Sequence, residues 1–422
     1  PSPSMPFDVI VGRNESDKLA FANKGLAYIG KTYVTMGNYT SLSNPIYMDV
    51  ARSHVILVAG KRGSGKSYSL SVIAEGLTNL DSESSKNIAS LMFDTMGIFW
   101  TMKFKNEKDK LLLEEWNLKP QELPIKVFAP FGKIQDYESK GIPVDETFAL
   151  KSSELEAEDW VITFNLSMTS QEGVLITKTI SELKEKMDEF TIADILHEID
   201  KEYEVSKETK NVASALFQAA DTWGIFAKPK MQGTEIPDLI EAGKTSILDL
   251  SVYSSIGAFN VRALVIGIIS RKLFQQRLDS RKKEEIQAIQ HGLDYLSYKT
   301  KRDTPLVWLF VDEAHEFLPQ DYKTPATDSL VQLLREGRQP GISIVLATQQ
   351  PGKIHSDVMT QSDTVISHRI TAKLDTDALG QLTQSYLRTG LIDNVNQLPR
   401  VKGSAVVFDD SNERIFPIQI RP

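Results

Sequence analysis

The sequence contains no cysteine, and this absence removes two kinds of chemistry. Neither a disulfide nor a thiolate metal site can form, so we expect a reducing compartment, the cytoplasm. Long apolar runs are also missing. No stretch approaches the roughly 20 residues that a membrane-spanning helix needs, and no signal peptide is visible. We therefore expect no membrane partner.

Positive charge is in deficit. The 422 residues include 48 Lys and Arg against 56 Asp and Glu, which gives a formal net charge of −8. An acidic surface does not attract nucleic acid as a whole. Any nucleic-acid contact must therefore be local, for example a ring of lysines that lines a pore. The hydrophobic content of 41% is typical of a globular protein, and the length of 422 residues is enough for a large core and a second, smaller domain.

Several catalytic motifs are missing as well. The six histidines are scattered, and His197-Glu198 lacks the second histidine of a zinc-protease helix. We find no Gly-x-Ser-x-Gly nucleophile elbow and no repeat of solenoid length. His54 and His315 flank the candidate site described next, and we expect a structural role for both.

What the sequence does contain is a phosphate-binding loop, written G-x-x-x-x-G-K-S, at residues 60–67. An apolar run at 55–59 precedes it and a helical pattern follows, which argues against a chance Gly/Ser-rich turn. Its glycines let backbone N–H groups point at phosphate oxygens. Lys66 would reach the β- and γ-phosphates, and the Ser67 hydroxyl would bind Mg²⁺. The predicted nucleotide-binding residues are Gly60, Gly63, Ser64, Gly65, Lys66, Ser67 and Tyr68.

An acidic pair, Asp312-Glu313, ends another apolar run at 306–311. Such a pair is the expected partner of a phosphate loop. Asp312 would hold the Mg²⁺ shell, and Glu313 would orient and deprotonate the attacking water. Because isolated Asp-Glu pairs are common, the prediction depends on the phosphate loop in the same chain.

A further strand, predicted at 342–347, ends in Thr348-Gln349. The Gln349 amide could sense the γ-phosphate or the attacking water. Arg335 and Arg338 precede this strand and are candidates for a charge-stabilising finger that reaches a neighbouring subunit's nucleotide. Either arginine could equally form a surface ion pair.

Strands that alternate with helical segments predict an α/β fold with a parallel sheet. Residues 5–54 instead look like a small β element, with pieces at 26–29 and 33–35 separated by Gly30. The strands expected in the core lie at 55–59, 88–93, 125–128, 244–250, 306–311, 342–347, 364–367, 404–408 and 415–420.

Residues 150–230 have a different character, because several helical patterns follow one another without a strand between them. We interpret them as a helical insertion in the α/β core; further crossover helices are the alternative. The helices are expected at 172–188, 191–203 and 207–223, with Ser170 and Thr191 near N-terminal caps. The proposed divisions are an N-terminal β segment at 1–45, a core at 46–130 and 240–422, and the insertion at 131–239. Residues 1–4, ahead of Met5, look like a remnant of expression.

Basic residues gather near the end of a long helix expected at about 260–281. A second cluster lies at 299–302. Such runs can be a solvated helix face or a contact with phosphate backbones, and the pattern leaves both open. The residues are Arg271, Lys272, Arg277, Arg281, Lys282, Lys283, Lys299, Lys301 and Arg302.

Several motifs in the same order resemble the HerA branch of the HerA/FtsK translocases. They are the phosphate loop, Asp94-Thr95-Met96-Gly97, PLVWLFVDEAHEFLP at 305–319 and LLREGRQPGISIVLATQQPGKI at 333–354. Segments 243–274 and 361–369 also fit. The resemblance implies a RecA-like P-loop core and a homo-hexameric ring that hydrolyses ATP with Mg²⁺ and moves on double-stranded DNA.

The resemblance also assigns residues. It implies Lys66 and Ser67 for phosphate and Mg²⁺, Asp312 and Glu313 as the acidic pair, Gln349 as the strand-tip sensor, and Arg338 as the trans-acting arginine. The sequence departs from the family pattern in three places: Gln350 replaces a common arginine, Met96 replaces a histidine, and the N-terminal barrel that docks a nuclease is expected to be reduced.

Two functions remain in view. The first is a DNA translocase or helicase acting with a separate effector, either a NurA-like nuclease or an antiphage effector. The second is an ATP-binding ring scaffold that activates an effector with little DNA movement. The acidic net charge mildly favours the scaffold.

Overall fold

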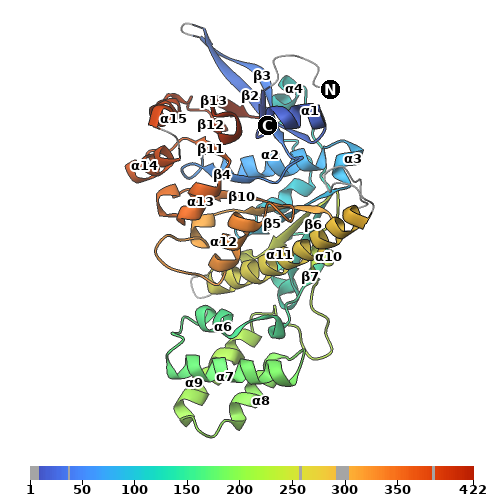
Figure 1. The fold of residues 1–422 in the computed structure, drawn as a ribbon, viewed down its shortest axis with the longest axis vertical. Helices are drawn as coiled ribbons and strands as arrows, with labels where there is room; N and C mark the ends of the chain where they lie inside the picture. The colour runs from blue at the N-terminus through green and yellow to red at the C-terminus, as the bar shows by residue number, and fades with distance from the viewer. Residues whose placement is uncertain (1–8, 37–38, 256–258, 291–303, 383–384) are drawn as a thin grey trace.

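A single open sheet runs through the structure (Figure 1). The computed structural model describes residues 9–36, 39–255, 259–290, 304–382 and 385–422. Within these residues, thirteen strands lie in the order β1-β3-β2-β13-β12-β11-β4-β10-β9-β5-β8-β6-β7. Their bounds are β1 (Val9–Val11), β2 (Leu26–Met36), β3 (Tyr39–Asp49), β4 (Val55–Ala59), β5 (Ile88–Asp94), β6 (Ile125–Pro130), β7 (Glu146–Phe148), β8 (Thr245–Asp249), β9 (Leu306–Val311), β10 (Ile342–Thr348), β11 (Thr364–His368), β12 (Ser404–Asp409) and β13 (Arg414–Ile420).

The eight strands from β11 to β7 are parallel, whereas β11, β12, β13, β2 and β3 pair antiparallel in turn. Every residue of β4, β5, β8 and β10 is buried. Strands covered on both faces need continuous apolar runs, which is the pattern that the sequence shows. The structure confirms the predicted α/β fold with a mainly parallel sheet.

Alternate residues of β4 face two separate cores, as the two-residue period of a strand requires. Leu57 belongs to one core together with Leu264 and Leu333, from α11 (Phe259–Gln290) and α12 (Thr327–Glu336). Ile56 and Val58 belong to the other, with the apolar side chains of α2 (Lys66–Thr78). The helices therefore cover both faces of the sheet, and α11 continues beyond its predicted end.

The remaining helices are short, or they form the insertion. The short ones are α1 (Glu15–Phe21), α3 (Ser82–Ser85), α4 (Lys110–Glu115), α5 (Ile134–Ser139), α13 (Ser356–Gln361), α14 (Lys373–Gln381) and α15 (Ser385–Gln397). No helix in the described part of the chain is both long and apolar enough to cross a membrane.

The insertion forms a helical lobe at the opposite end of the molecule from the β2–β3 hairpin (Figure 1). It contains α6 (Ala157–Thr163), α7 (Gln171–Lys186), α8 (Ile192–Lys201) and α9 (Lys207–Asp221), so the three predicted helices are confirmed. The short α10 (Ile236–Leu239) lies outside the lobe, beside α11 (Figure 1). Trp160 and Phe217 pack edge to face at 4.9 Å in its core. Ser170 and Thr191 cap α7 and α8 as predicted. β7, within the range proposed for the insertion, still pairs with β6.

The N-terminal strands extend the central sheet through the pairing of β2 with β13. The predicted break at Gly30 is wrong, because β2 is continuous through it. A Cβ atom at Gly30 would lie 2.1 Å from the backbone oxygen of Gln419 on β13. The glycine therefore serves close strand approach, not a turn.

A buried charge network fastens the N-terminal segment to the core. Arg13 and His54 both contact Asp49, at 2.6 and 2.8 Å, and the other ring nitrogen of His54 lies 2.9 Å from Asp363. Burial by itself would lower the pKa of His54, but the hydrogen bonds to Asp363 and Asp49 outweigh it and raise the pKa to about 9. His54 therefore has the structural role that we expected, as a buried cation between two carboxylates.

This network predicts that stability depends on pH. Because the His54 pKa is raised from 6.5 to about 9, its contribution is fully present below pH 6.5 and is lost as pH rises through 9. A shift of this size corresponds to about 3 kcal/mol. As the pH is raised from about 6 to about 10, we expect the urea concentration at the midpoint of unfolding to decrease in the wild type. It should change much less in His54→Gln. His197→Gln, at an exposed position on α8, is the control. Equal pH dependence in the wild type and His54→Gln would contradict the account.

Candidate nucleotide-binding site

The phosphate loop connects the end of β4 to the start of α2, as the sequence predicts. Gly65, the N-cap of α2, has φ of 107°, a backbone conformation that glycine adopts at no steric cost. A Cβ atom at Gly60 would lie 2.4 Å from Ser64 Oγ and 2.7 Å from His368 Cβ. The loop is thus shaped by its glycines, and it ends at a helix N-terminus that favours phosphate.

Lys66 and Ser67 lie where α2 begins. Lys66 is 6% exposed, and its Nζ donates one hydrogen bond, 3.2 Å long, to the backbone oxygen of Lys61. Burial lowers the pKa of Lys66, and the charges of Glu313 and Asp312 oppose this shift. Ser64 Oγ is buried without a hydrogen-bond partner in the described residues. An ammonium with donors to spare beside an unpartnered hydroxyl suits a phosphate.

The two predicted Mg²⁺ ligands are in contact. Ser67 Oγ donates a hydrogen bond of 2.7 Å to Asp312 Oδ2, although 245 positions separate them in the chain. Within the residues that the structure describes, no group of three or more His, Cys, Asp or Glu side chains could hold a metal ion. Mg²⁺ usually binds through one or two protein oxygens together with phosphates and water, so this pair fits it.

Glu313 adopts a strained backbone conformation beside this pair. Its φ is 49°, in the left-handed region that costs a residue with a side chain about 1–2 kcal/mol. Burial raises the pKa of the Glu313 carboxyl, Asp312 adds to the effect, and Lys66 opposes it. Its Oε2 is buried and has no hydrogen-bond partner among the described residues. A carboxylate with this environment can accept a proton from water.

The tip of β10 lies between the loop and the acidic pair, because Thr348 is in register with Ala59 of β4 and Leu346 with Val311 of β9. Gln349 follows directly and is half-buried. The residue thus follows the edge of the sheet where the phosphate loop lies. Tyr68, in contrast, lines a neighbouring hollow of about 530 Å³ together with Trp100 and Phe104.

Arg335 and Arg338 lie at the opposite edge of the sheet, before the amino end of β10. Arg335 pairs with Asp357, and Arg338 donates to the backbone oxygen of Gln361. Seven residues of β10 span roughly 20 Å, which a single side chain cannot bridge. Neither arginine can therefore reach the nucleotide of its own chain.

Residues that sequence analysis missed support the site from neighbouring strands. His368, at the end of β11, contacts Ser69 Oγ at 2.8 Å, and the backbone oxygen of Arg369 accepts from Lys61 N–H. Burial lowers the pKa of His368 to about 4, so the ring is neutral. A polar residue at the end of a predicted strand was the available signal.

A second missed residue, Asp249, is the register partner of Asp94. Burial and the charge of Asp249 raise the pKa of Asp94 to about 7, and burial also raises the pKa of Asp249. Asp94 accepts the backbone N–H groups of Gly97 and Phe99, at 2.7 and 2.8 Å. Asp94, with Asp249 beside it, therefore shapes the loop after β5, at the edge of the sheet where the phosphate loop lies.

The basic end of α11 is largely engaged inside the chain. Arg271 pairs with Asp159 at 2.9 Å and Lys272 with Glu154 at 2.8 Å. Arg277 is 1% exposed and donates to the backbone oxygen of Pro340. For these three residues the structure favours contacts within the chain over a contact with phosphate backbones, because each has a partner in the fold. Lys299, Lys301 and Arg302 lie outside the described residues.

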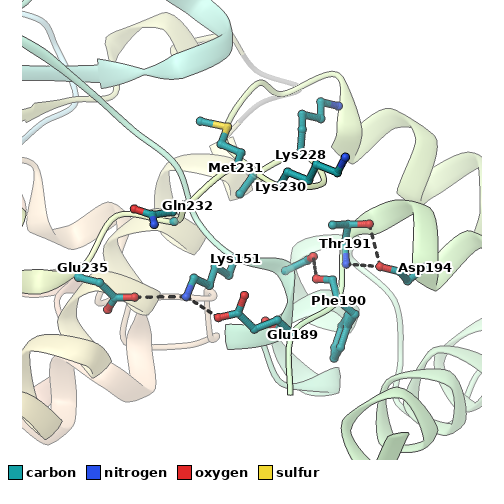
Figure 2. A pocket seen from close by; sticks show the side chains of 14 residues that line it. Lys151, Glu189, Phe190, Thr191, Asp194, Lys228, Lys230, Met231, Gln232 and Glu235 are labelled. Atoms are coloured by element: carbon teal, nitrogen blue, oxygen red, sulfur yellow. Dashed lines mark hydrogen bonds and ion pairs between the residues drawn. The ribbon is translucent and has the colours of Figure 1, made fainter. Parts of the chain in front are cut away.

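A large hollow also lies at the base of the insertion, away from the phosphate loop (Figure 2). Its volume is about 610 Å³. Lys151 lies between Glu189 and Glu235, at 2.7 and 3.5 Å, and Asp194 caps α8. These charges satisfy one another within the chain, so the hollow adds nothing to the nucleotide site.

Two protein families have models that match this chain. The family described as "Helicase HerA, central domain" matches residues 29–273, and the family "Zonular occludens toxin (Zot)" matches residues 259–417. One curated relative, the probable DNA double-strand break repair helicase HerA of Methanocaldococcus jannaschii, is 26% identical over 353 residues. The DNA double-strand break repair helicase HerA of Pyrococcus furiosus is 27% identical over 178 residues.

These matches cover 78% and 40% of this chain. The aligned parts amount to 65% of the first relative's length and 31% of the second's.

Two solved structures share the fold. VirB4 of Thermoanaerobacter pseudethanolicus has a TM-score of 0.59 at 10% identity and covers 94% of this chain and 97% of that one. The bacterial conjugative coupling protein TrwB has a TM-score of 0.52 at 12% identity and covers 92% and 89%.

The mainly parallel sheet, with a phosphate loop between β4 and α2, defines a P-loop protein with a RecA-like core. Within that class, the match over more than half of the 422 residues shows that the chain belongs to the HerA helicase central-domain family. The resemblance seen in the sequence motifs is thereby confirmed.

The geometry separates two roles that mutation can test. Lys66→Ala removes the buried ammonium, so we expect binding of a fluorescent ATP analogue to weaken at least tenfold. Glu313→Gln keeps the shape but cannot accept a proton, so binding should remain within about twofold while turnover falls about 100-fold or more. Analogue titration and phosphate release measure the two effects. Wild-type turnover in Glu313→Gln would show that another group is the base.

Proposed function

We propose that this chain is the motor subunit of a homo-hexameric ring that hydrolyses ATP with Mg²⁺ and moves along double-stranded DNA. The observation that carries the hydrolysis is the contact of Ser67 with Asp312, next to Glu313, whose buried Oε2 has no hydrogen-bond partner among the described residues. In this role Lys66 and the loop N–H groups hold the phosphates, and Ser67 and Asp312 hold Mg²⁺. Mg²⁺ would stabilise charge that develops on the phosphate oxygens.

We propose Glu313 as the base that takes the proton of the attacking water, and Gln349 as the group that orients that water from the tip of β10. The raised pKa of Glu313 makes it a stronger base than an exposed carboxylate. Arg338 would complete the site of a neighbouring subunit, which its distance from the chain's own loop supports. Such a finger makes hydrolysis depend on assembly.

The proposed partner on the substrate side is double-stranded DNA, because both curated relatives are named DNA double-strand break repair helicases. Contacts with phosphates carry no sequence information, so binding would be sequence-independent. We further propose a separate effector, a NurA-like nuclease or an antiphage effector protein, and a cytoplasmic location, where such DNA substrates are found.

One observation favours a second candidate, the ATP-binding ring scaffold. The net charge is −8, and three of the basic residues near the end of α11 are committed to internal partners. In a ring, these three residues would have less charge to offer to DNA. The ring would then organise an effector with little movement of its own along DNA.

DNA stimulation of hydrolysis distinguishes the two functions. For a translocase, we expect random-sequence duplex to raise the ATPase rate severalfold, with no dependence on sequence. The stimulation should disappear between about 50 and 200 mM salt, because phosphate contacts release counterions. Phosphate release is measured with the wild type, and Lys66→Ala serves as the blank. A rate that duplex leaves unchanged at low salt would favour the scaffold.

A further inference from the structure

His315 lies just beyond the acidic pair, in the short 3-10 helix η6 (Ala314–Glu316). Its side chain is only 11% exposed, and it faces two polar groups, one at the end of β10 and one in the N-cap residue of η6. Nδ1 lies 3.0 Å from Thr348 Oγ1 at the end of β10. Nε2 lies 3.5 Å from Glu313 Oε2. The ring thus occupies the space between the β10 tip and the proposed catalytic base.

One set of hydrogen-bond directions is consistent with every contact along this path. The backbone N–H of Gln350 donates to Thr348 Oγ1 at 3.0 Å. The hydroxyl of Thr348 still has its proton to donate, and His315 Nδ1 accepts it when the ring carries its proton on Nε2. Burial, helped by the charges of Lys66 and Lys353, lowers the pKa of His315 to about 4, so the ring is neutral. In the tautomer in which Nδ1 accepts from Thr348, the one N–H of the neutral ring is at Nε2, directed toward Glu313.

Glu313 needs such a donor. Its Oε2 is buried and has no hydrogen-bond partner among the described residues, and its backbone is held at a φ of 49°. A separation of 3.5 Å is longer than a formed hydrogen bond. Contacts of this kind in ligand-free active sites are often long and shorten when the reacting complex forms. The Nε2–H group is the neighbour placed to close on that oxygen.

We propose that His315 is a positioning residue that ties the Glu313 carboxylate to the tip of β10. The path runs from Gln350 N–H through the Thr348 hydroxyl and the His315 ring to Glu313. Gln349 lies within the same tip, so the base and the water-orienting amide would keep one relative geometry. This inference rests on the proposed hydrolysis of ATP, and it replaces the purely structural role that we expected from the sequence.

Two substitutions test the acceptor at Nδ1 and the donor at Nε2 of the His315 ring separately. His315→Asn keeps an acceptor near the Nδ1 position and loses the donor to Glu313, whereas His315→Gln can place an amide N–H near the Nε2 position. We expect kcat to fall about 10- to 100-fold in His315→Asn, as for other groups that orient a reacting residue. In His315→Gln the loss should be within about threefold. KM for ATP and binding of a fluorescent analogue should stay within about twofold in both.

Thr348 supplies an independent check. Thr348→Val removes the hydroxyl at nearly constant volume, and Thr348→Ser keeps it. We expect a lower kcat in Thr348→Val, recovery in Thr348→Ser, and no further loss when Thr348→Val is added to His315→Asn, because the two act along one path. His197→Gln, an exposed position on α8, is the control for histidine replacement.

The outcomes are separable. If the two His315 variants behave alike, or if kcat, analogue binding and thermal stability fall together, the ring is only structural and the proposal is overturned. If the wild type hydrolyses no ATP, the proposed function fails, but the geometry remains testable by ¹⁵N NMR of the histidine rings. A proton on Nε2 of His315 that is lost or redistributed in Thr348→Val supports the path. A proton on Nδ1 in the wild type overturns it.

Discussion

The hydrogen bond between Ser67 and Asp312 is the contact on which the rest of the site depends. It joins the first turn of α2 to the end of β9, and it requires β4, β10 and β9 to end at the same level. Parallel strands meet this requirement because their carboxyl ends share one edge of the sheet. The sheet thus brings polar residues that are far apart in the chain into one row along the carboxyl ends of its parallel strands.

That row is longer than the nucleotide site. His368 ends β11 beside the phosphate loop, and Asp94 and Asp249 end β5 and β8 on the other side of the acidic pair. Each is buried, and each has a pKa moved away from its ordinary value. Burying an ionisable group raises the free energy of the folded state unless a partner stabilises it, and such groups gather at functional sites. Their presence along this edge of the sheet therefore marks the whole edge as part of a functional region.

Local signals made much of this structure predictable. The phosphate loop, the strand before Asp312 and the insertion helices α7 to α9 each depend on neighbouring residues, and the structure contains all of them. Other features depend on long-range partners. In the sequence Gly30 resembles a turn residue, and only the fold shows that Gln419 of β13 packs against it. Arg271 likewise resembles a free cation, and only the fold shows its ion pair with Asp159. Asp249 has no motif around it, and only its register with Asp94 brings it to the site edge.

The opposite edge of the sheet, where the parallel strands begin, carries the proposed trans-acting arginine. Arg338 is exposed there, a full strand length from the loop that its charge would serve. Our central claim is therefore that an active site is shared between two copies of the chain. Co-expression of Lys66→Ala with Arg338→Ala tests it, because each variant alone lacks one half of every site. We expect both to be nearly inactive alone, and mixed rings to regain activity at about a quarter of their interfaces. A mixture no more active than its components would contradict the shared site.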